Sequence, residues 1–212
     1  LASVRTNDLF NQLSPLKWKW SDQALSCYYF GAQGPDLFFY INRTNPFAKE
    51  SFKELGSKLH NEKIGAVIKD MVRYAASSEN EKVIAYVSGF ISHYIMDAHC
   101  HPLISKWGPD SKSHKRVELN LDALTILDLT GKPIHQMSLD HWTFDPEIIQ
   151  NDIAALWNHV LVKNFETQVP REAFWNATLD LLRIEKILLN DTVSKLPFKR
   201  SLSKLFHYDL SD

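Results

Sequence analysis

Three residues of metal-binding types stand at four-residue intervals near the middle of the chain. His93, Asp97 and His101 occupy positions i, i+4 and i+8 of a segment whose apolar residues recur with helical periodicity. At about 100° per residue they drift only about 80° around a helix axis, so all three project from one side. Imidazole and carboxylate groups within an apolar face are costly to bury unless each has a partner, and one divalent ion can serve all three. A lone histidine is more often a hydrogen-bonded core residue, but three co-facial ligands favour a metal site.

A second set of candidates follows in the segment SHKRVE. His114 and Glu118 stand there at i and i+4, so they can bind one ion from one face of a helix. By itself, such a pair is commonly exposed to solvent and binds nothing. The 12-residue return from His101, through a Gly-Pro turn, to an antiparallel helix can bring the pair opposite His101. We therefore expect these three residues to lie together.

Asp36 and His60 are further candidates, and each has an ordinary alternative. Asp36 follows a Gly-Pro turn and precedes the apolar run Leu-Phe-Phe-Tyr, which would draw its loop inward. An Asp after Pro is, however, usually a turn residue. His60 closes a helix, where a histidine often serves only the helix dipole. His99 stands two residues from Asp97, on roughly the opposite face, and is left out of the ligand set.

The candidate ligands are nitrogen and oxygen donors without a thiolate, a set that suits hydrolytic zinc rather than a structural cysteine site. Their number is too large for one tetrahedral ion and suits two or more. Clustered ions favour phosphoryl ester chemistry, in which one ion generates hydroxide at neutral pH and its neighbours neutralise the phosphate oxygens. The candidates are Asp36, His60, His93, Asp97, His101, His114 and Glu118.

Composition predicts an all-α, single-domain helical bundle over residues 1–212. The chain is 44% hydrophobic, which is enough for one sizeable core, and 212 residues do not require a second domain. Glycine is scarce and β-branched alternation is nearly absent. The ligand motifs fall within 31–118, and 130–212 is expected to form packing helices. The expected helices cover 3–13, 16–29, 45–60, a segment ending near 76, 79–101, 111–129, 145–163, 170–189 and a short stretch after Pro197.

The end of the helix predicted over 79–101 depends on a proline. Pro102 disfavours the α conformation at His101, so the helix over 79–101 is expected to end or kink there. His101 would then point from a helix terminus.

Charge, hydropathy and cysteine content bear on the partners and the localisation of the protein. The net charge of −1 implies no broad basic surface, so long nucleic acid is not expected as a partner. No apolar run reaches the length of a membrane span. Two cysteines, neither in a C-x-x-C, and no visible leader favour the cytoplasm, with secretion as the alternative if a leader was removed upstream of Leu1. The oligomeric state is open.

Four segments, in order and spacing, carry a resemblance to a known family. GAQGPDLFFY, LGSKLH, GFISHYIMDAHCHP and SHKRVE resemble the bacterial zinc-dependent phospholipase C family, whose fold is shared with the fungal single-strand-specific zinc nucleases. The resemblance covers residues 31–118 and implies an all-α bundle that holds a trinuclear zinc cluster.

The resemblance also implies a role for each ligand. Asp36 would be the general base beside the attacking water. The first zinc would be held by Asp36, His60, His93 and Asp97, the second by His101, His114 and Glu118, and Asp97 would also reach towards a third. Secreted members hold the third ion with an amino-terminal Trp and an early His. Here residue 1 is Leu and no His precedes His60, so either those ligands lay upstream or the site has two metals.

Together these features predict a zinc-dependent phosphodiester hydrolase of the phospholipase C type, in which metal-bound hydroxide attacks a phospholipid phosphodiester. A nuclease-type or small-molecule phosphodiesterase is one alternative. A zinc-binding helical protein without turnover is another.

Overall fold

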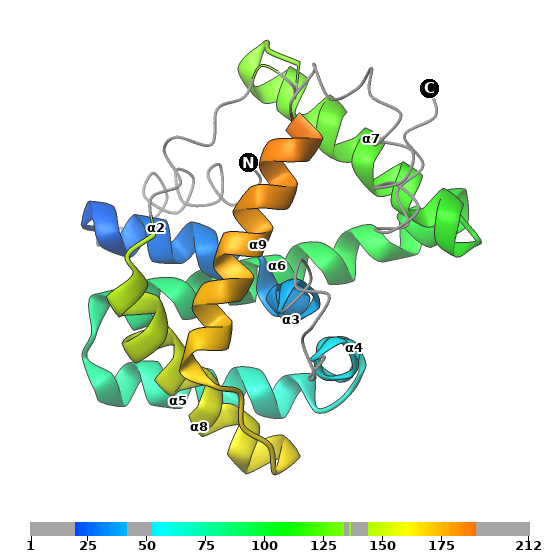
Figure 1. The fold of residues 1–212 in the computed structure, drawn as a ribbon. Helices are drawn as coiled ribbons and strands as arrows, with labels where there is room; N and C mark the ends of the chain where they lie inside the picture. The colour runs from blue at the N-terminus through cyan, green and yellow to red at the C-terminus, as the bar shows by residue number, and fades with distance from the viewer. Residues whose placement is uncertain (1–19, 42–51, 134–135, 137–143, 190–212) are drawn as a thin grey trace, which may run out of the picture. The chain divides into compact units, whose positions relative to one another are not determined.

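Helices are the only regular elements in the part of the chain that this computed structural model describes, which comprises residues 20–41, 52–133, 136 and 144–189 (Figure 1). The all-α prediction is therefore confirmed. The described residues divide into two compact units. The larger unit contains 20–41, 52–94 and 144–182, and the smaller unit contains 95–133, 136 and 183–189. The expectation of a single domain stays a prediction.

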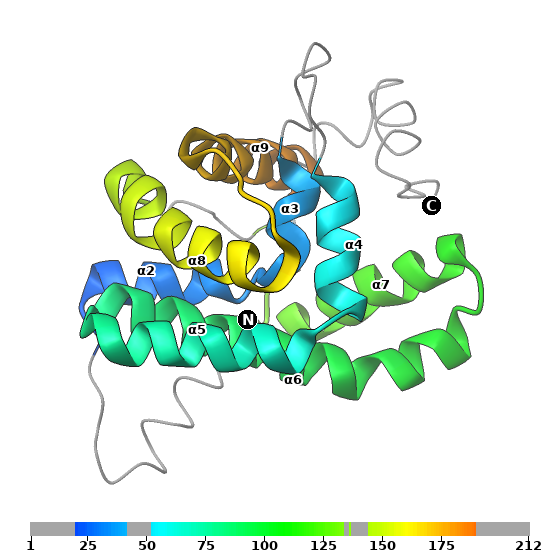
Figure 2. The same ribbon diagram turned by 90° about the horizontal axis from the view of Figure 1, so that it is seen from below.

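The larger unit holds most of the elements. α5 and the first half of α6 lie side by side and antiparallel (Figure 2). A two-residue turn joins them, with Glu79 in the left-handed conformation. The elements of this unit are α2 (Asp22–Gly31), η1 (Gly34–Asp36), α3 (Leu37–Tyr40), α4 (Lys53–Asn61), α5 (Ile64–Ser78), the first half of α6 (Glu81–Trp107), η3 (Ile148–Ile153), α8 (Ala154–Phe165) and most of α9 (Arg171–Leu189).

The core of the larger unit is built around Trp157 of α8. The rings of Phe38 and Phe90 meet it edge-on, with centroids 4.8 and 5.5 Å away. Its indole Nε1 donates a 2.7 Å hydrogen bond to the hydroxyl of Tyr86, so the one polar atom of this buried ring is satisfied. Among the described residues, the hydrophobic core cluster lies entirely in this unit. It anchors α3, which follows Asp36, and the first half of α6, which carries His93.

The smaller unit contains the second half of α6, α7 (Ser111–Thr130) and the last residues of α9. Asp110 and Ser113 form a capping box at the start of α7, which satisfies backbone N–H groups that have no partner within the helix. Gly131, in the left-handed conformation, ends α7. These two signals explain why the predicted helix over 111–129 agrees closely with the structure.

The predicted end of the central helix is wrong. α6 continues through Pro102 to Trp107, and Gly108 N–H donates to the carbonyl of Ile104 at its end. A proline removes one helical hydrogen bond, but the bonds on either side can hold the helix together. His101 therefore projects from the body of a helix rather than from its terminus.

Most other boundaries agree within a few residues, but two helices start later than predicted: α2 starts at Asp22 rather than at residue 16, and Phe52, inside the predicted helix over 45–60, precedes α4. α2 begins at Asp22 because the Ser21 side chain accepts a hydrogen bond from Ala24 N–H. The predicted helices over 3–13 and after Pro197, and the predicted start at Asn45, lie outside the described residues. Within the described ranges, no helix combines the length and the apolar character that crossing a membrane requires.

Candidate metal centres

The larger unit brings Asp36, His60 and His93 together from three separate elements. Each offers one ligand atom, and the three atoms lie within 4.8 Å of one another. Asp36 ends η1, His60 lies in the last turn of α4, and His93 lies near the middle of α6. We call these three residues the Asp36 group. All three residues are partly exposed, although the Nε2 atom of His93 is itself buried.

The turn before α3 positions Asp36. Gly34, the first residue of η1, adopts a left-handed φ of +59°, and Pro35 follows at the second position. The next two residues, Leu37 and Phe38, are buried. The apolar run therefore draws this loop onto the core, as expected, and leaves the Asp36 carboxylate at the surface beside His60.

His60 is held on both sides of its ring. Its Nδ1 lies 2.8 Å from the carbonyl oxygen of Gly56, one turn earlier in α4. The ring stacks on Phe39 of α3, with centroids 5.5 Å apart and planes at 21°. Its Nε2 then lies 3.0 Å from Oδ1 of Asp36.

His93 is the most constrained member of the Asp36 group. Its Nδ1 lies 3.1 Å from the carbonyl oxygen of Ala32. Its Nε2 is buried and has no hydrogen-bond partner in the structure. A Cβ on Gly34 would come within 2.3 Å of the imidazole, so only glycine leaves room for this ring. An orphaned buried nitrogen of this kind needs an explanation, and a cation is one.

The hydrogen bonds fix which ring nitrogen is available. A carbonyl oxygen can only accept, so Nδ1 of both His60 and His93 must carry the proton. In a neutral imidazole, Nε2 then presents a lone pair. In the Asp36 group these lone pairs converge on a carboxylate, and converging acceptors repel one another unless a proton or a cation lies among them. The residues therefore fit a zinc ion, which takes neutral imidazole nitrogen and carboxylate oxygen.

The smaller unit holds the second group, which we call the His101 group. Nε2 of His101 and Nε2 of His114 lie 3.3 Å apart, and Oε1 of Glu118 is 3.8 and 3.2 Å from them, respectively. The expected juxtaposition of these three residues is thus present. Gly108 permits the tight turn between the helices, because a Cβ there would lie 2.5 Å from the backbone nitrogen of His114.

Asp97 orients His101 in the smaller unit. Its Oδ1 lies 2.8 Å from Nδ1 of His101, and its backbone oxygen lies 3.1 Å from the same atom. A carboxylate behind a ligating histidine fixes the ring and raises its basicity. The predicted contribution of Asp97 to the ion of the Asp36 group stays a prediction, as do the ligand roles of the other six residues.

Several supporting residues were not predicted from the sequence. The sequence places Phe39 in an apolar run that could line a substrate pocket and Gly34 in a turn, but it does not indicate that Phe39 stacks on His60 or that Gly34 makes room for His93. The carbonyl groups of Ala32 and Gly56 leave no signal in the sequence, because every residue has one. His99, which was left out of the ligand set, is exposed, and its Nδ1 hydrogen-bonds the carbonyl oxygen of Ile95.

Comparison with known proteins identifies the family. The model of the zinc-dependent phospholipase C family matches residues 7–176, which is more than half of the chain and includes both groups of ligands. Neither the curated proteins nor the solved structures contain a match to this chain. The all-helical regular structure of the described ranges and the two sets of zinc-type ligands agree with the family match. This match covers most of the chain, so the chain belongs to the zinc-dependent phospholipase C family.

Proposed function

We propose that this protein hydrolyses phospholipids at the phosphodiester bond, releasing diacylglycerol and a phosphorylated head group. The observation that supports this most is the Asp36 group, where two Nε2 lone pairs and a carboxylate converge among partly exposed residues of a zinc-dependent family member. We further propose one zinc ion at each group.

Each group has the donors that one zinc ion needs. Asp36, His60 and His93 would hold one ion, and His101, His114 and Glu118 would hold another. Three protein ligands leave a tetrahedral ion one open position, which is the arrangement of catalytic rather than structural zinc. Zinc bound there would lower the pKa of water towards neutrality and offset the charge of the phosphate oxygens.

The chain's own contribution to proton transfer would come from Asp36. A carboxylate has two oxygens, so one can face the ion while the other accepts a proton from the attacking water. The side chain of Asp36 is nearly half exposed, which leaves room for that water. His60, held by Gly56 and Phe39, places its Nε2 3.0 Å from this carboxylate, so the two groups would face the same ion.

Turnover by zinc-loaded protein tests this proposal. We expect hydrolysis of bis-p-nitrophenyl phosphate, and of phosphatidylcholine or phosphatidylethanolamine in mixed micelles with diacylglycerol as product. Asp36→Asn should abolish turnover while zinc remains bound, and Asp22→Asn, which changes an exposed carboxylate of α2, should have no effect.

Three results would contradict parts of the proposal. Unchanged activity in Asp36→Asn would remove this residue from the mechanism. Cleavage of single-stranded DNA but not of phospholipid would indicate the nuclease-type alternative. Bound zinc without turnover of any phosphodiester would indicate a zinc-binding protein that is not an enzyme.

A further inference from the structure

The smaller unit exposes most of the large apolar side chains that face solvent in the described part of the chain. Six of eight lie there, although the hydrophobic core cluster lies entirely in the larger unit. These six are Ile95, Met96, Leu103, Trp107, Leu124 and Leu127. Single exposed apolar residues need no explanation, but a concentration of them in one region does.

Three of them form a stripe along the second half of α6. Met96, Leu103 and Trp107 stand at i, i+7 and i+11, so they share one face of the helix within about 40°. Trp107 is 55% exposed, although an indole ring is among the largest apolar groups available. His101 points to roughly the opposite side, towards His114. This part of α6 therefore turns its ligand inward and its apolar face outward.

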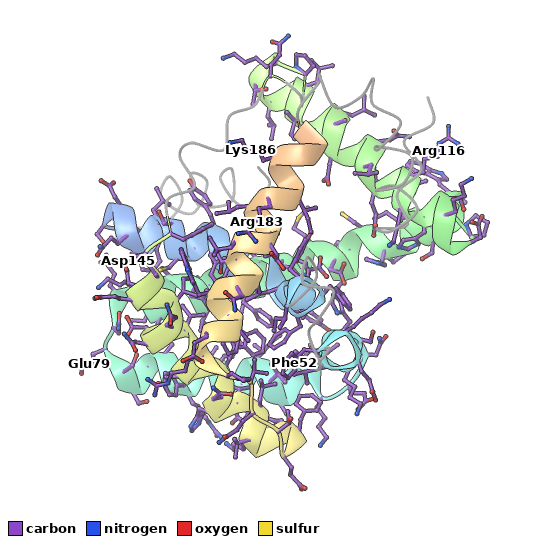
Figure 3. All side chains as sticks on the ribbon, in the orientation of Figure 1. Phe52, Glu79, Arg116, Asp145, Arg183 and Lys186 are labelled. Carbon is purple, nitrogen blue, oxygen red and sulfur yellow. The ribbon has the colours of Figure 1, made fainter. Side chains whose placement is uncertain are left out.

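Basic residues lie at and just after the end of this stripe in the sequence. Residues 103–116 contain four basic side chains and one carboxylate, in a chain whose net charge is −1. Lys106, Lys112 and Arg116 are exposed, and Arg116 projects away from α7 (Figure 3). The one carboxylate, Asp110, is engaged in capping α7. The corner between α6 and α7 thus combines an exposed indole with local positive charge.

We propose that this corner, formed by the Met96–Leu103–Trp107 stripe and the basic residues of 103–116, docks onto the surface of an anionic lipid bilayer. Tryptophan favours the interface between acyl chains and head groups, and lysine and arginine beside it bind anionic lipid phosphates. The inference rests on the proposed function, because a phospholipid substrate lies in such a surface. The docking proposal names the part of the protein that would contact the membrane.

The charge of the corner argues for a bilayer over a second copy of the chain. In a symmetric dimer the same surface would face itself, so the two basic clusters would repel each other. An anionic bilayer instead complements them. Trp107 lies six residues beyond His101, about 9 Å along the helix axis. Docking through Trp107 would therefore hold the His101 group close to the head groups.

Sedimentation of zinc-loaded full-length protein with sucrose-loaded vesicles tests the proposal. We expect binding to vesicles of phosphatidylcholine and phosphatidylglycerol at 3:1, and much weaker binding to pure phosphatidylcholine. Leu103→Ser with Trp107→Ala should weaken binding at least about tenfold, because two large apolar side chains no longer enter the interface. Lys106→Gln with Arg116→Gln should weaken it about 30-fold at low salt, since each basic residue near such a surface contributes about fivefold.

Matched variants in the larger unit serve as controls. Val72→Ser with Val162→Ser changes two exposed apolar residues, and Lys69→Gln with Arg171→Gln removes one lysine and one arginine. Both should bind vesicles as the wild type does. Circular dichroism and the thermal midpoint should be the same in all four variants, because every changed residue is exposed.

Two outcomes would overturn the proposal: no binding of the wild type to anionic vesicles, or unchanged binding in both corner variants. Sedimentation equilibrium supplies a third. A wild-type dimer that Leu103→Ser with Trp107→Ala dissociates would show that a second copy covers this surface. Failure of the proposed function would look different, because vesicle binding would persist without hydrolysis. Hydrolysis of bis-p-nitrophenyl phosphate without vesicle binding would retain the enzyme and overturn the docking.

Discussion

The two candidate metal groups contain the same kinds of side chain but are assembled in different ways. The His101 group comes from two consecutive helices joined by a three-residue turn, and two of its members are one helical turn apart. The Asp36 group comes from η1, α4 and α6, and depends on contacts between segments far apart in the sequence. We expect the His101 group to tolerate changes elsewhere in the fold, and the Asp36 group to respond to them.

Loss of His93 should have the largest effect. His93→Ala removes the buried Nε2 that has no partner, and we expect the zinc of the Asp36 group to be lost while that of the His101 group stays. A catalytic metal contributes several kcal/mol to transition-state stabilisation, so phosphodiester turnover should fall about 1,000-fold. Elemental analysis and steady-state kinetics on one preparation measure the zinc content and the turnover.

The control for this variant is His99→Ala, which changes an exposed histidine and should alter neither zinc content nor turnover. Loss of both ions in His93→Ala would show that the two groups do not bind zinc separately.

Gly34 offers a sharper test of how the Asp36 group is held. Gly34→Ala should weaken zinc binding there by up to about 100-fold, because the new Cβ must displace the imidazole of His93. Gly131→Ala is a matched control. Both glycines have a left-handed φ, of +59° and +66°, but a Cβ on Gly131 meets nothing within 4 Å. Both variants should lose about 1 kcal/mol of stability to backbone strain, and only Gly34→Ala should lose zinc affinity in a competition titration. Equal zinc affinity in the two variants would exclude a positioning role for Gly34.

The sequence could predict much of this arrangement where the information is local. The i, i+4 spacing of His114 and Glu118 and the cap at Asp110 place the His101 group without knowledge of the rest of the fold. The Asp36 group was only nominated, because no spacing relates a turn at 36 to helices ending near 60 and passing through 93. The continuation of α6 past Pro102 was mispredicted because the prediction relied on one local preference. A local preference at one residue did not decide a helix whose hydrogen bonds continue on both sides.

Asp97 tests whether the two groups share a residue. Asp97→Asn weakens the partner that orients His101, and we expect about tenfold lower zinc affinity at the His101 group. If Asp97 also binds the ion of the Asp36 group, as the family resemblance implies, that ion should weaken too. Competition titrations in the backgrounds His93→Ala and His114→Ala would resolve each group separately. No change at the His101 group would contradict the orienting role.

Asp70 provides a carboxylate that supports the fold without belonging to either group. Hydrogen bonds from Lys163 Nζ at 2.6 Å and Asn164 Nδ2 at 3.0 Å hold the pKa of this buried carboxyl below its ordinary value. Its contribution to stability is therefore present above the ordinary carboxyl range, near pH 4, and is lost as the pH falls through the depressed pKa.

Asp70→Asn should lower the free energy of unfolding at pH 7 by about 2 kcal/mol, and the difference from wild type should shrink by pH 3. Urea unfolding at both pH values measures this, with the exposed Asp128→Asn as the control. Zinc content at pH 7 should not change. A difference that grows towards low pH would contradict the assigned direction of the pKa.

The most direct measurement is the zinc content per chain of protein purified without added metal or chelator. We expect one zinc ion in each of the two groups, one ion left in His93→Ala, one left in His114→Ala, and none in the combined variant. Such independent losses would establish two zinc sites with separate ligands. Wild-type protein that is folded but retains no zinc would contradict the assignment, because the converging imidazole nitrogens and carboxylates would then be held by protons alone.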